Sequence, residues 1–441
     1  MKRLYTFWIS VLFNLFFISS VTAQYLSPLE STTDRFLRYV KIDTQSKYDV
    51  DTVPSTQKQF DLARLLVKEI NFLGATGITL SDHCIVYATI PANLEDNTNV
   101  PVLGLIAHLD TSPDVSGTNV NPIIHSNYQG GEITLPEDTS QKITSENSPE
   151  IKKLIGDDII TADGTTLLGA DDKAGCAEIM TTLDILQQNP QIKHGDIAIA
   201  FIPDEEVGRG IDKFDIELFG ADYAITVDGI SVGEINIETF FAREATITFK
   251  GKAYNPGYAE NKMINSTYAA ADFITRLPKD MLPETTSGRE GFLHPYNASL
   301  AVESSKIEIL LRDFELEGLD KFQLMLVNIA KEVEENFPEV NIDIIFRDEY
   351  MNMKEVLKDH PLLTECIFEA SEKAGIEPYL VAVRGGTDGA ILTFKGIPCP
   401  NLFSGGENYH SKLEFISRNR MDKTTETLVN LVQIFAEKYN K

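Results

Sequence analysis

The sequence predicts an α/β domain, with a mostly parallel sheet flanked by helices, that is interrupted by a smaller α+β domain. Three apolar runs, each ending at polar turn residues, suit strands that are buried on both faces of such a sheet. After about residue 245 the pattern changes to alternating apolar and polar residues, which is typical of strands with one open face. With 441 residues, the chain is long for one hydrophobic core and sufficient for two domains.

The elements of the main domain follow in order. Amphipathic helices are expected over residues 32–38 and 56–73, where apolar side chains recur at helical spacing. A further helix is expected over residues 174–188, between the first and second apolar runs. The runs themselves predict strands at residues 102–107, 197–202 and 224–227.

The alternating region predicts the insertion. Strands at residues 244–250, 305–311 and 341–346 are separated by helices at residues 262–277 and 320–336. The main domain then resumes through residues 355–374 and ends with a helix over residues 425–439. Insertions of this kind often act as lids or dimer surfaces, so a homodimer formed through this domain is expected. The predicted division is main domain 24–240 and 351–441, with the insertion at 241–350.

The first residues have the layout of a secretory signal peptide. Lys2 and Arg3 precede a largely apolar run over residues 4–18, and Val21-Thr22-Ala23 offers small residues for cleavage. The alternative, a membrane anchor, needs about 20 apolar residues, more than this run provides. The sequence therefore predicts a signal peptide at residues 1–23 and an exported protein that is not held in a membrane, periplasmic if the source is a Gram-negative bacterium.

Composition excludes one class of partner. The formal net charge of −27 repels phosphate backbones, which argues against nucleic-acid binding. The cysteines show no CxxC spacing, so neither a thiolate metal site nor a disulfide framework is indicated. Buried free thiols are expected at Cys84, Cys176, Cys366 and Cys399.

Acidic and imidazole groups gather where the predicted strands end. The carboxyl ends of strands form the site crevice in open α/β sheets, so these groups are expected to converge there. The segments are AHLDT (107–111), LGADDKAG (168–175), PDEEVGRG (203–210), TVDG (226–229) and GGENYH (405–410).

This inventory matches a site for two metal ions. Zinc binds imidazole nitrogen and carboxylate oxygen, and two neighbouring ions need one shared bridging group. One aspartate can bridge, while one histidine and one carboxylate complete each half and leave each metal an open position. The candidate ligands are His108, Asp171, Glu206, Asp228 and His410. The residues alone do not separate Asp171 from Asp172, or Glu205 from Glu206.

Two further acids have predicted catalytic roles. One member of the Glu205-Glu206 pair can bind metal while the other takes a proton from the attacking water. Asp110 lies two residues after His108, on the same side of an extended chain, and is expected to accept a hydrogen bond from the non-ligating nitrogen of that imidazole. Each feature alone has a simpler explanation: a packed histidine, a solvated acidic pair, or an Asp-Asp helix cap.

Together, these segments resemble the metal-dependent exopeptidase superfamily that includes glutamate carboxypeptidase and the acetylornithine deacetylases. With RGGTDGA (384–390) and NLFSGGENYHSKLEF (401–415), they are more narrowly similar to the peptidase T family of tripeptide aminopeptidases. The most specific motifs are TTLLGADDKAG (165–175) and RGGTDGA followed by IPCPNLFSGG (397–406). The likeness runs from about Ser31 to the C-terminus. It implies a zinc-dependent exopeptidase fold, an α/β domain interrupted by a βαββαβ domain, and tripeptides as substrates.

The resemblance also implies roles for individual residues. Two zinc ions per subunit are expected, with Asp171 as the bridging ligand and Glu205 as the proton acceptor. Asp110 becomes the second catalytic acid. His108 and Asp228 would hold one ion, and Glu206 and His410 the other. Members of the family are typically cytoplasmic, which is the alternative to export.

One segment departs from the family pattern. Family members commonly carry His-Pro-Gly early in the small domain, where the histidine stabilises the oxyanion; here the segment reads Asn255-Pro256-Gly257. Asparagine donates a hydrogen bond but brings no positive charge, and losing one oxyanion donor costs about 10²–10³ in turnover. Asn255 is equally well explained as a turn residue before Pro-Gly.

Substrate contacts and neighbouring activities stay open. Arg312 resembles a family arginine that binds the peptide carboxylate, with a surface ion pair as the alternative. Arg384 and Asp388 flank a glycine-rich turn, and Asp388 is the candidate partner of the free α-amino group.

A dipeptidase, a carboxypeptidase or an N-acyl-amino-acid deacylase would show the same metal ligands. A non-catalytic binding protein is the third possibility, disfavoured because every ligand is present.

Overall fold

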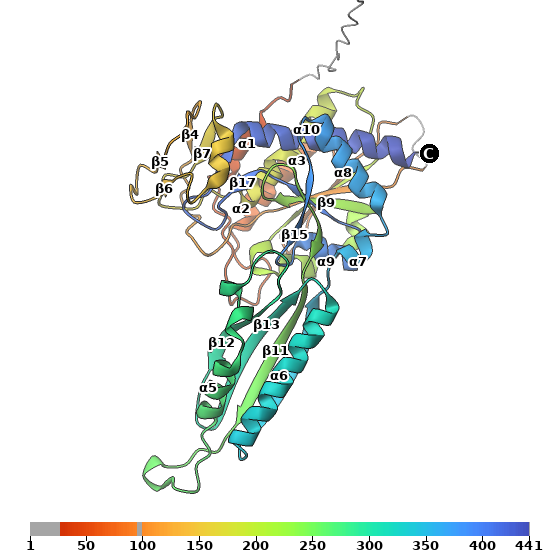
Figure 1. Ribbon diagram of the computed structural model, residues 1–441. Coiled ribbons are helices and arrows are strands. Elements are labelled where there is room, and N and C mark those ends of the chain that lie inside the picture. Colours follow the sequence, from red (N-terminus) through yellow and green to blue (C-terminus); the bar gives the residue numbers. More distant parts are fainter. Residues whose placement is uncertain (1–26, 95–98, 441) are drawn as a thin grey trace, which may run out of the picture.

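The computed structural model describes residues 27–94 and 99–440. The predicted signal peptide lies outside these residues, and export stays a prediction. Within the described ranges, no helix combines the length and apolar character needed to cross a bilayer. The chain forms a main α/β domain from which an elongated second domain projects (Figure 1).

A mixed sheet forms the centre of the main domain. Ile199 and Phe201 of β8 pack on one face, whereas Ala200 and Ile202 pack on the other, which explains the continuous apolar run. Strands β8, β3, β9 and β16 run parallel to one another, but β1 and β2 form an antiparallel hairpin. The order across the sheet is β1 (Thr76–Leu80), β2 (Val86–Ile90), β8 (Ile197–Ile202), β3 (Leu103–His108), β9 (Tyr223–Gly229), β16 (Asn401–Phe403), β10 (Glu234–Thr239) and β15 (Tyr379–Val383).

Helices cover both faces of this sheet. The larger layer packs through one extensive core and consists of α1 (Thr32–Tyr39), α2 (Gln59–Phe72), α3 (Ala170–Gln188), α8 (Pro361–Lys373) and α10 (Arg418–Tyr439). The opposite face is covered by α4 (Ile216–Phe219) and α9 (Asp388–Phe394), with α7 (Lys354–Leu357) beside β10. All four cysteines are buried free thiols, as predicted. The predicted fold class is confirmed, and β2 and β10 run antiparallel to their neighbours β8 and β16.

The inserted segment has a hydrophobic core of its own, which includes Ile247, Phe273 and Leu326. Its sheet is antiparallel in the order β12-β13-β11-β14, and the helices pack against one face. The alternating pattern of apolar and polar residues did not predict β12, because this edge strand carries Pro295. Proline is tolerated in a strand only where no partner strand needs its N–H. The elements are β11 (Phe241–Lys250), α5 (Ser266–Arg276), β12 (Phe292–Ser299), β13 (Ser304–Asp313), α6 (Leu316–Asn336) and β14 (Asn341–Tyr350).

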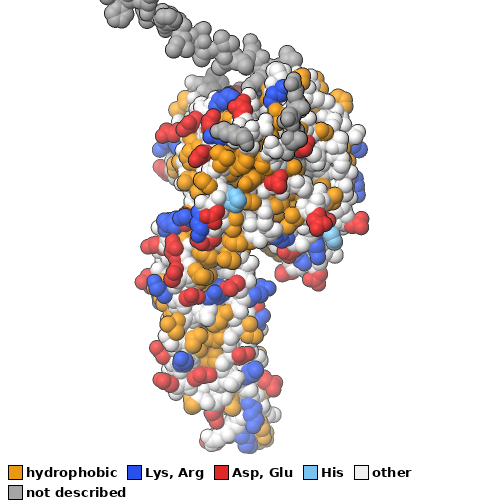
Figure 2. Space-filling view, turned by 90° about the vertical axis from the view of Figure 1, so that its right-hand side faces the viewer, with side chains coloured by type: hydrophobic (Ala, Val, Ile, Leu, Met, Phe, Trp, Pro, Cys, Tyr) orange, Lys and Arg blue, Asp and Glu red, His pale blue; other side chains and the backbone are white. Residues whose placement is uncertain are grey.

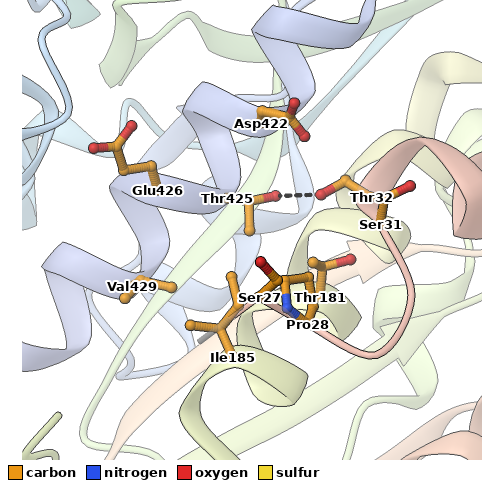
Figure 3. Close-up of a pocket in the computed structure, with 10 residues that line it drawn as sticks. All are labelled: Ser27, Pro28, Ser31, Thr32, Thr181, Ile185, Asp422, Thr425, Glu426 and Val429. Atoms are coloured by element: carbon orange, nitrogen blue, oxygen red, sulfur yellow. Dashed lines mark hydrogen bonds between the residues drawn. The ribbon is translucent and has the colours of Figure 1, made fainter. Parts of the chain in front are cut away.

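Smaller sheets flank the main one. The first pairs β17 (Gly406–Glu407), β18 (Phe415–Ser417), β7 (Ile159–Thr161) and β4 (Ile123–His125), and the second pairs β5 (Ile133–Thr134) with β6 (Lys142–Ile143). On the face shown in Figure 2, acidic and basic side chains are interspersed over both domains. A cavity of about 370 Å³ opens between α1, α3 and α10, where the hydroxyls of Thr32 and Thr425 lie 3.0 Å apart (Figure 3). None of the predicted site residues lines that cavity.

Candidate metal centre and active site

The motif segments converge at one end of the main sheet. Strands β8, β3 and β9 are parallel neighbours, so the residues at their carboxyl ends meet. His108 ends β3, the Glu205-Glu206 pair follows β8, and Asp228 lies near the end of β9. Asp171 enters from the start of α3, and the loop between β17 and β18 brings His410.

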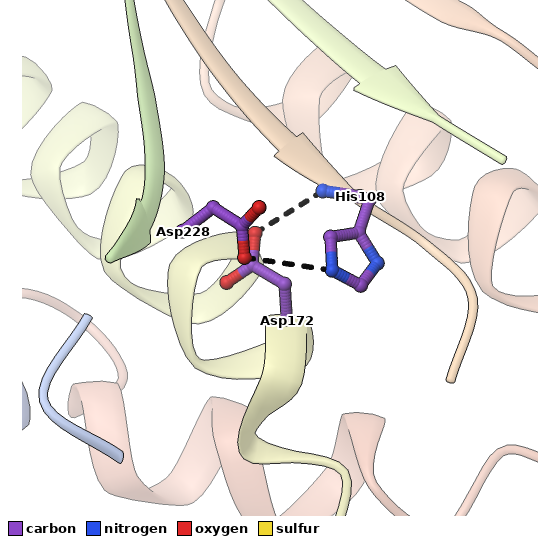
Figure 4. Close-up of side chains that lie close together, drawn as sticks. All are labelled: His108, Asp172 and Asp228. Carbon is purple, nitrogen blue, oxygen red and sulfur yellow. Dashed lines mark hydrogen bonds and ion pairs between the residues drawn. The ribbon is translucent and has the colours of Figure 1, made fainter. Parts of the chain in front are cut away.

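His108 is the buried centre of the first half of the cluster. Its Nε2 lies 2.8 Å from Asp171 Oδ1 and 3.6 Å from Asp228 Oδ1. Figure 4 shows His108 and Asp228 facing each other from the ends of adjacent strands. Burial opposes protonation, but the charge of Asp228 and hydrogen bonds with Asp110 and Asp171 raise the pKa of His108 well above its ordinary value.

Asp171 joins the two halves. Its Oδ2 lies 3.3 Å from His410 Nε2, and that nitrogen lies 2.7 Å from Glu206 Oε2. Hydrogen bonds with Asp171 and Glu206 raise the pKa of His410 to about 11, against the effect of burial. One aspartate therefore contacts both imidazoles, which is the arrangement that a bridging ligand requires.

Asp172 is engaged elsewhere. Its Oδ2 accepts the backbone N–H of His108 at 3.1 Å (Figure 4). Its Oδ1 accepts the backbone N–H of Gly175 at 3.0 Å. Asp171 and Asp172 have non-helical backbone angles near the start of α3, so the second bond caps the regular helix that follows them. Ligand atoms of His108, Asp172 and Asp228 also lie within 4.8 Å of one another, as do those of His108, Asp171 and Glu206. Proximity does not separate the two aspartates, but their hydrogen bonds favour Asp171 as the ligand and Asp172 as the cap.

The electrostatics of the cluster fit bound cations. Within the described residues, Glu206 Oε1 is buried without a hydrogen-bond partner. Burial, together with the charge of Asp171, raises the pKa of Glu206 to about 8. An unpaired buried carboxylate oxygen is costly unless a cation or proton meets it. The donor set of imidazole nitrogen and carboxylate oxygen therefore suits divalent metal ions of the zinc type.

Asp110 contacts both His108 and the glutamate pair. Nδ1 of His108 donates to the backbone carbonyl of Asp110 at 3.1 Å, while the nearer carboxylate oxygen lies 3.5 Å away. The Asp110 carboxylate instead accepts the backbone N–H groups of Glu205 and Glu206, at 3.0 and 3.3 Å. Strand β3 ends at His108, so the chain is not extended through residue 110, and the backbone carbonyl of Asp110 lies nearer to the imidazole than its carboxylate does.

Glu205 lines a cavity of about 490 Å³ between the main domain and the C-terminal end of β14. This volume lies within the range of small-ligand sites. Burial and the charge of Asp228 raise the pKa of Glu205 well above its ordinary value. Asp388, at the start of α9, lines the same cavity, and burial raises its pKa to about 7. Two acids with raised pKa values, Glu205 and Asp388, thus line one cavity.

Both arginines have hydrogen-bond partners within the chain. Arg312 donates to Glu349 Oε2 at 2.7 Å and to the Leu311 carbonyl at 3.0 Å, which is the ion-pair alternative. Arg384 donates to the Gly288 and Glu290 carbonyls, at 2.9 and 2.6 Å. Its guanidinium also lies 5.3 and 5.5 Å from the ring centroids of Phe240 and Phe292. It therefore connects the main domain to the inserted domain.

Asn255 lies outside the cluster. Its side chain accepts the N–H of Gly257 at 3.0 Å and caps a 3-10 turn, as the turn-residue alternative predicts. The connection between β11 and α5 that carries it is at the end of the inserted domain farthest from the main domain (Figure 1). Within one chain, Asn255 does not face the two imidazoles.

Arg384→Ala is expected to release the segment at residues 286–290. The substitution removes the bonds to Gly288 and Glu290 and a third to Thr286 Oγ1 at 3.0 Å. Faster amide hydrogen exchange in that segment, measured by mass spectrometry, is the expected result. Arg276→Ala is the control, because Arg276 pairs with Asp272 and Glu332 inside the inserted domain. Equal exchange in both variants would contradict the assigned contact.

Two acids near the cluster were not predicted. Asp114 Oδ2 lies 3.4 Å from His410 Nδ1. The Glu414 carboxylate accepts backbone N–H groups of residues 168, 169 and 171. Burial raises the pKa of Glu414 to about 7, against hydrogen bonds from Gly169 and Asp171. No sequence signal distinguishes these side chains from solvated acids, because their partners are distant in the chain.

Comparison with known proteins places the chain in a family. The family model of peptidase family M20/M25/M40 matches residues 159–434. Peptidase T from Clostridium acetobutylicum is 45% identical over 410 residues, covering 93% of this chain and 100% of the relative. Peptidase T from Geobacillus thermodenitrificans is 45% identical over 405 residues, covering 92% and 98%.

The chain belongs to the peptidase T family of M20 peptidases. The fold agrees with solved structures: an aminopeptidase PepT from Bacillus cereus has a TM-score of 0.70 at 23% identity, covering 92% of this chain and 98% of that one. A dinuclear metal-binding M20 peptidase from Bacillus subtilis has a TM-score of 0.62 at 14% identity, covering 92% and 98%. As a peptidase T family member the protein is a peptide hydrolase, which confirms the family and enzyme class predicted from sequence.

Proposed function

We propose that this protein is a two-zinc aminopeptidase that releases the N-terminal residue of tripeptides. The observation that carries the proposal is Asp171, which contacts both His108 and His410 and thereby joins two ligand groups from distant parts of the chain. Relatives named peptidase T, at 45% identity over nearly their whole length, support tripeptides as the substrate.

The proposed ligands divide into two groups that share Asp171. His108 and Asp228 would complete one site, and Glu206 and His410 the other. What divalent cations supply when bound is Lewis acidity toward a peptide carbonyl and a water molecule. Imidazole and carboxylate ligands favour zinc, although cobalt and manganese also bind such sets.

Glu205 acts as the proton acceptor in this proposal. Its raised pKa makes it a stronger base than a solvated glutamate, and it lies in the cavity beside the cluster. It takes a proton from the attacking water and returns that proton to the nitrogen of the leaving amine. Asp110 positions the base, because its carboxylate holds the backbone N–H groups of both Glu205 and Glu206.

Asp388 is the proposed partner of the substrate's free α-ammonium group. Its carboxylate lines the same cavity as Glu205 and is buried at the start of α9. A buried carboxylate gains more from an ammonium partner than an exposed one does, because water screens it less. This contact would make the enzyme depend on a free amino terminus.

Nα-acetylation of a tripeptide is therefore expected to lower kcat/KM by about 10²-fold or more, as for loss of a buried charged contact worth about 3 kcal/mol. The assay compares free and acetylated tripeptides, together with a dipeptide and a tetrapeptide, with and without a chelator. Asp388→Asn should reduce the preference for free over acetylated substrate. Equal cleavage of acetylated and free tripeptides by the parent protein would exclude an aminopeptidase.

A homodimer formed through the inserted domain remains part of the proposal. Asn255 lies at the distal end of that domain, so it reaches a metal cluster only if it belongs to a second copy. The same proposal includes domain boundaries at residues 240/241 and 350/351. It also includes a role for the inserted domain as a lid.

A further inference from the structure

Glu414 is a buried acid whose carboxylate accepts hydrogen bonds from backbone N–H groups. Its side chain is 1% exposed. Oε2 accepts the N–H groups of Leu168 and Gly169, both at 2.8 Å, and Oε1 accepts that of Asp171 at 3.1 Å. Bonds between a carboxylate and N–H groups are roughly twice as strong as neutral ones.

The segment at residues 168–171 is shaped to receive an anion. Gly169 has φ +84°, a left-handed conformation that turns successive N–H groups toward one point. A Cβ at this position would also lie 3.2 Å from Thr111 Cγ2, so a larger residue is disfavoured. The glycine thus allows one carboxylate to hold the backbone immediately before and at Asp171.

The loop that supplies Glu414 also carries His410, and hydrogen bonds within the loop hold its conformation. Asn408 Nδ2 donates to the Leu413 carbonyl at 3.0 Å, and Ser411 Oγ donates to the Asn408 carbonyl at 2.7 Å. The N–H of Leu413 donates to Ser411 Oγ at 3.1 Å. One rigid loop therefore presents the imidazole of His410 and, four residues later, the carboxylate that holds Asp171.

We propose that Glu414 is a positioning residue that fixes the backbone of Asp171 relative to His410 and so sets the geometry of both halves of the cluster. The inference rests on the proposed function, because it assigns Asp171 and His410 as ligands. Glu414 itself contacts neither substrate nor the reacting atoms in this proposal. Groups that orient ligands are costly to replace even though they do not bind the metal.

Glu414→Gln tests the assignment through metal affinity rather than through activity. The amide keeps the size of the side chain but has one acceptor oxygen, and its NH₂ group faces an N–H donor. Affinity for Zn²⁺, measured by competition with a coloured chelator, is expected to fall about 10–100-fold. Glu414→Asp keeps the charge but shortens the reach, and is expected to lose less; it also provides a folded variant if the glutamine protein does not fold.

Glu178→Gln is the matched control. Glu178 is a fully buried acid on α3, the helix that begins at Asp171, and both its carboxylate oxygens lack a hydrogen-bond partner among the described residues. This variant should keep the Zn²⁺ affinity of the parent. If both Glu414 variants also keep it, or lose only thermal stability, the positioning role is overturned. A parent protein that binds no divalent cation would instead overturn the proposed function.

Discussion

Glu205→Gln is expected to lower kcat for tripeptide hydrolysis by about 10²–10⁴-fold, the usual contribution of a general base. The amide cannot accept the proton that the attacking water must lose. The backbone of residue 205 should stay in place, because Asp110 holds it through the main-chain N–H rather than the side chain. Steady-state kinetics measure the loss of turnover. Elemental analysis of the purified variant is expected to show that the bound metal is retained.

Substitution of the neighbouring residue, Glu206, is expected to have a different effect from substitution of Glu205. Glu206→Gln removes a carboxylate whose Oε2 contacts His410 and whose Oε1 is buried without a partner among the described residues. It should lose both activity and bound metal, whereas Glu205→Gln loses activity alone. Undiminished hydrolysis by Glu205→Gln would refute the assigned base. Metal loss from both variants would show that the two glutamates share the ligand role.

Removal of metal is expected to abolish hydrolysis and to destabilise the fold. Chelation leaves the carboxylates of Asp171, Glu206 and Asp228 close together with two imidazoles as the compensating groups. A cation present at 1,000 times its Kd stabilises a protein by about 4 kcal/mol, and that contribution disappears on chelation. Differential scanning calorimetry and a hydrolysis assay, before and after dialysis against chelator, test the prediction.

Adding metal back to the chelated protein distinguishes loss of metal from irreversible damage to the protein. Adding back Zn²⁺ should recover both the melting temperature and the activity, and about two equivalents per chain should suffice because the ligands form two groups that share Asp171. Magnesium should restore little, since it prefers all-oxygen ligand sets. A chelated protein that hydrolyses tripeptides at the parent rate would contradict the metal-dependent mechanism.

Some choices within the site depended on three-dimensional contacts. The sequence left Asp171 and Asp172 open, because adjacent aspartates at a helix start look alike. The structure separates them by partner: Asp172 caps the helix at Gly175, and Asp171 faces both imidazoles. The contact of Arg384 with residues 288 and 290 follows in the same way from domain packing, which local pattern does not encode.

The sequence by itself determined the α/β class, the alternation that marks the insertion, and the acidic and imidazole segments at strand ends. These features are local: burial on two faces requires a continuous apolar run, and ligand chemistry requires particular residue types. Only the tertiary structure decided which acid holds which group, as in the link between Glu414 and the backbone of Asp171, 243 residues apart. Such contacts arise when distant segments are packed together, and neither segment carries a local signal of its partner.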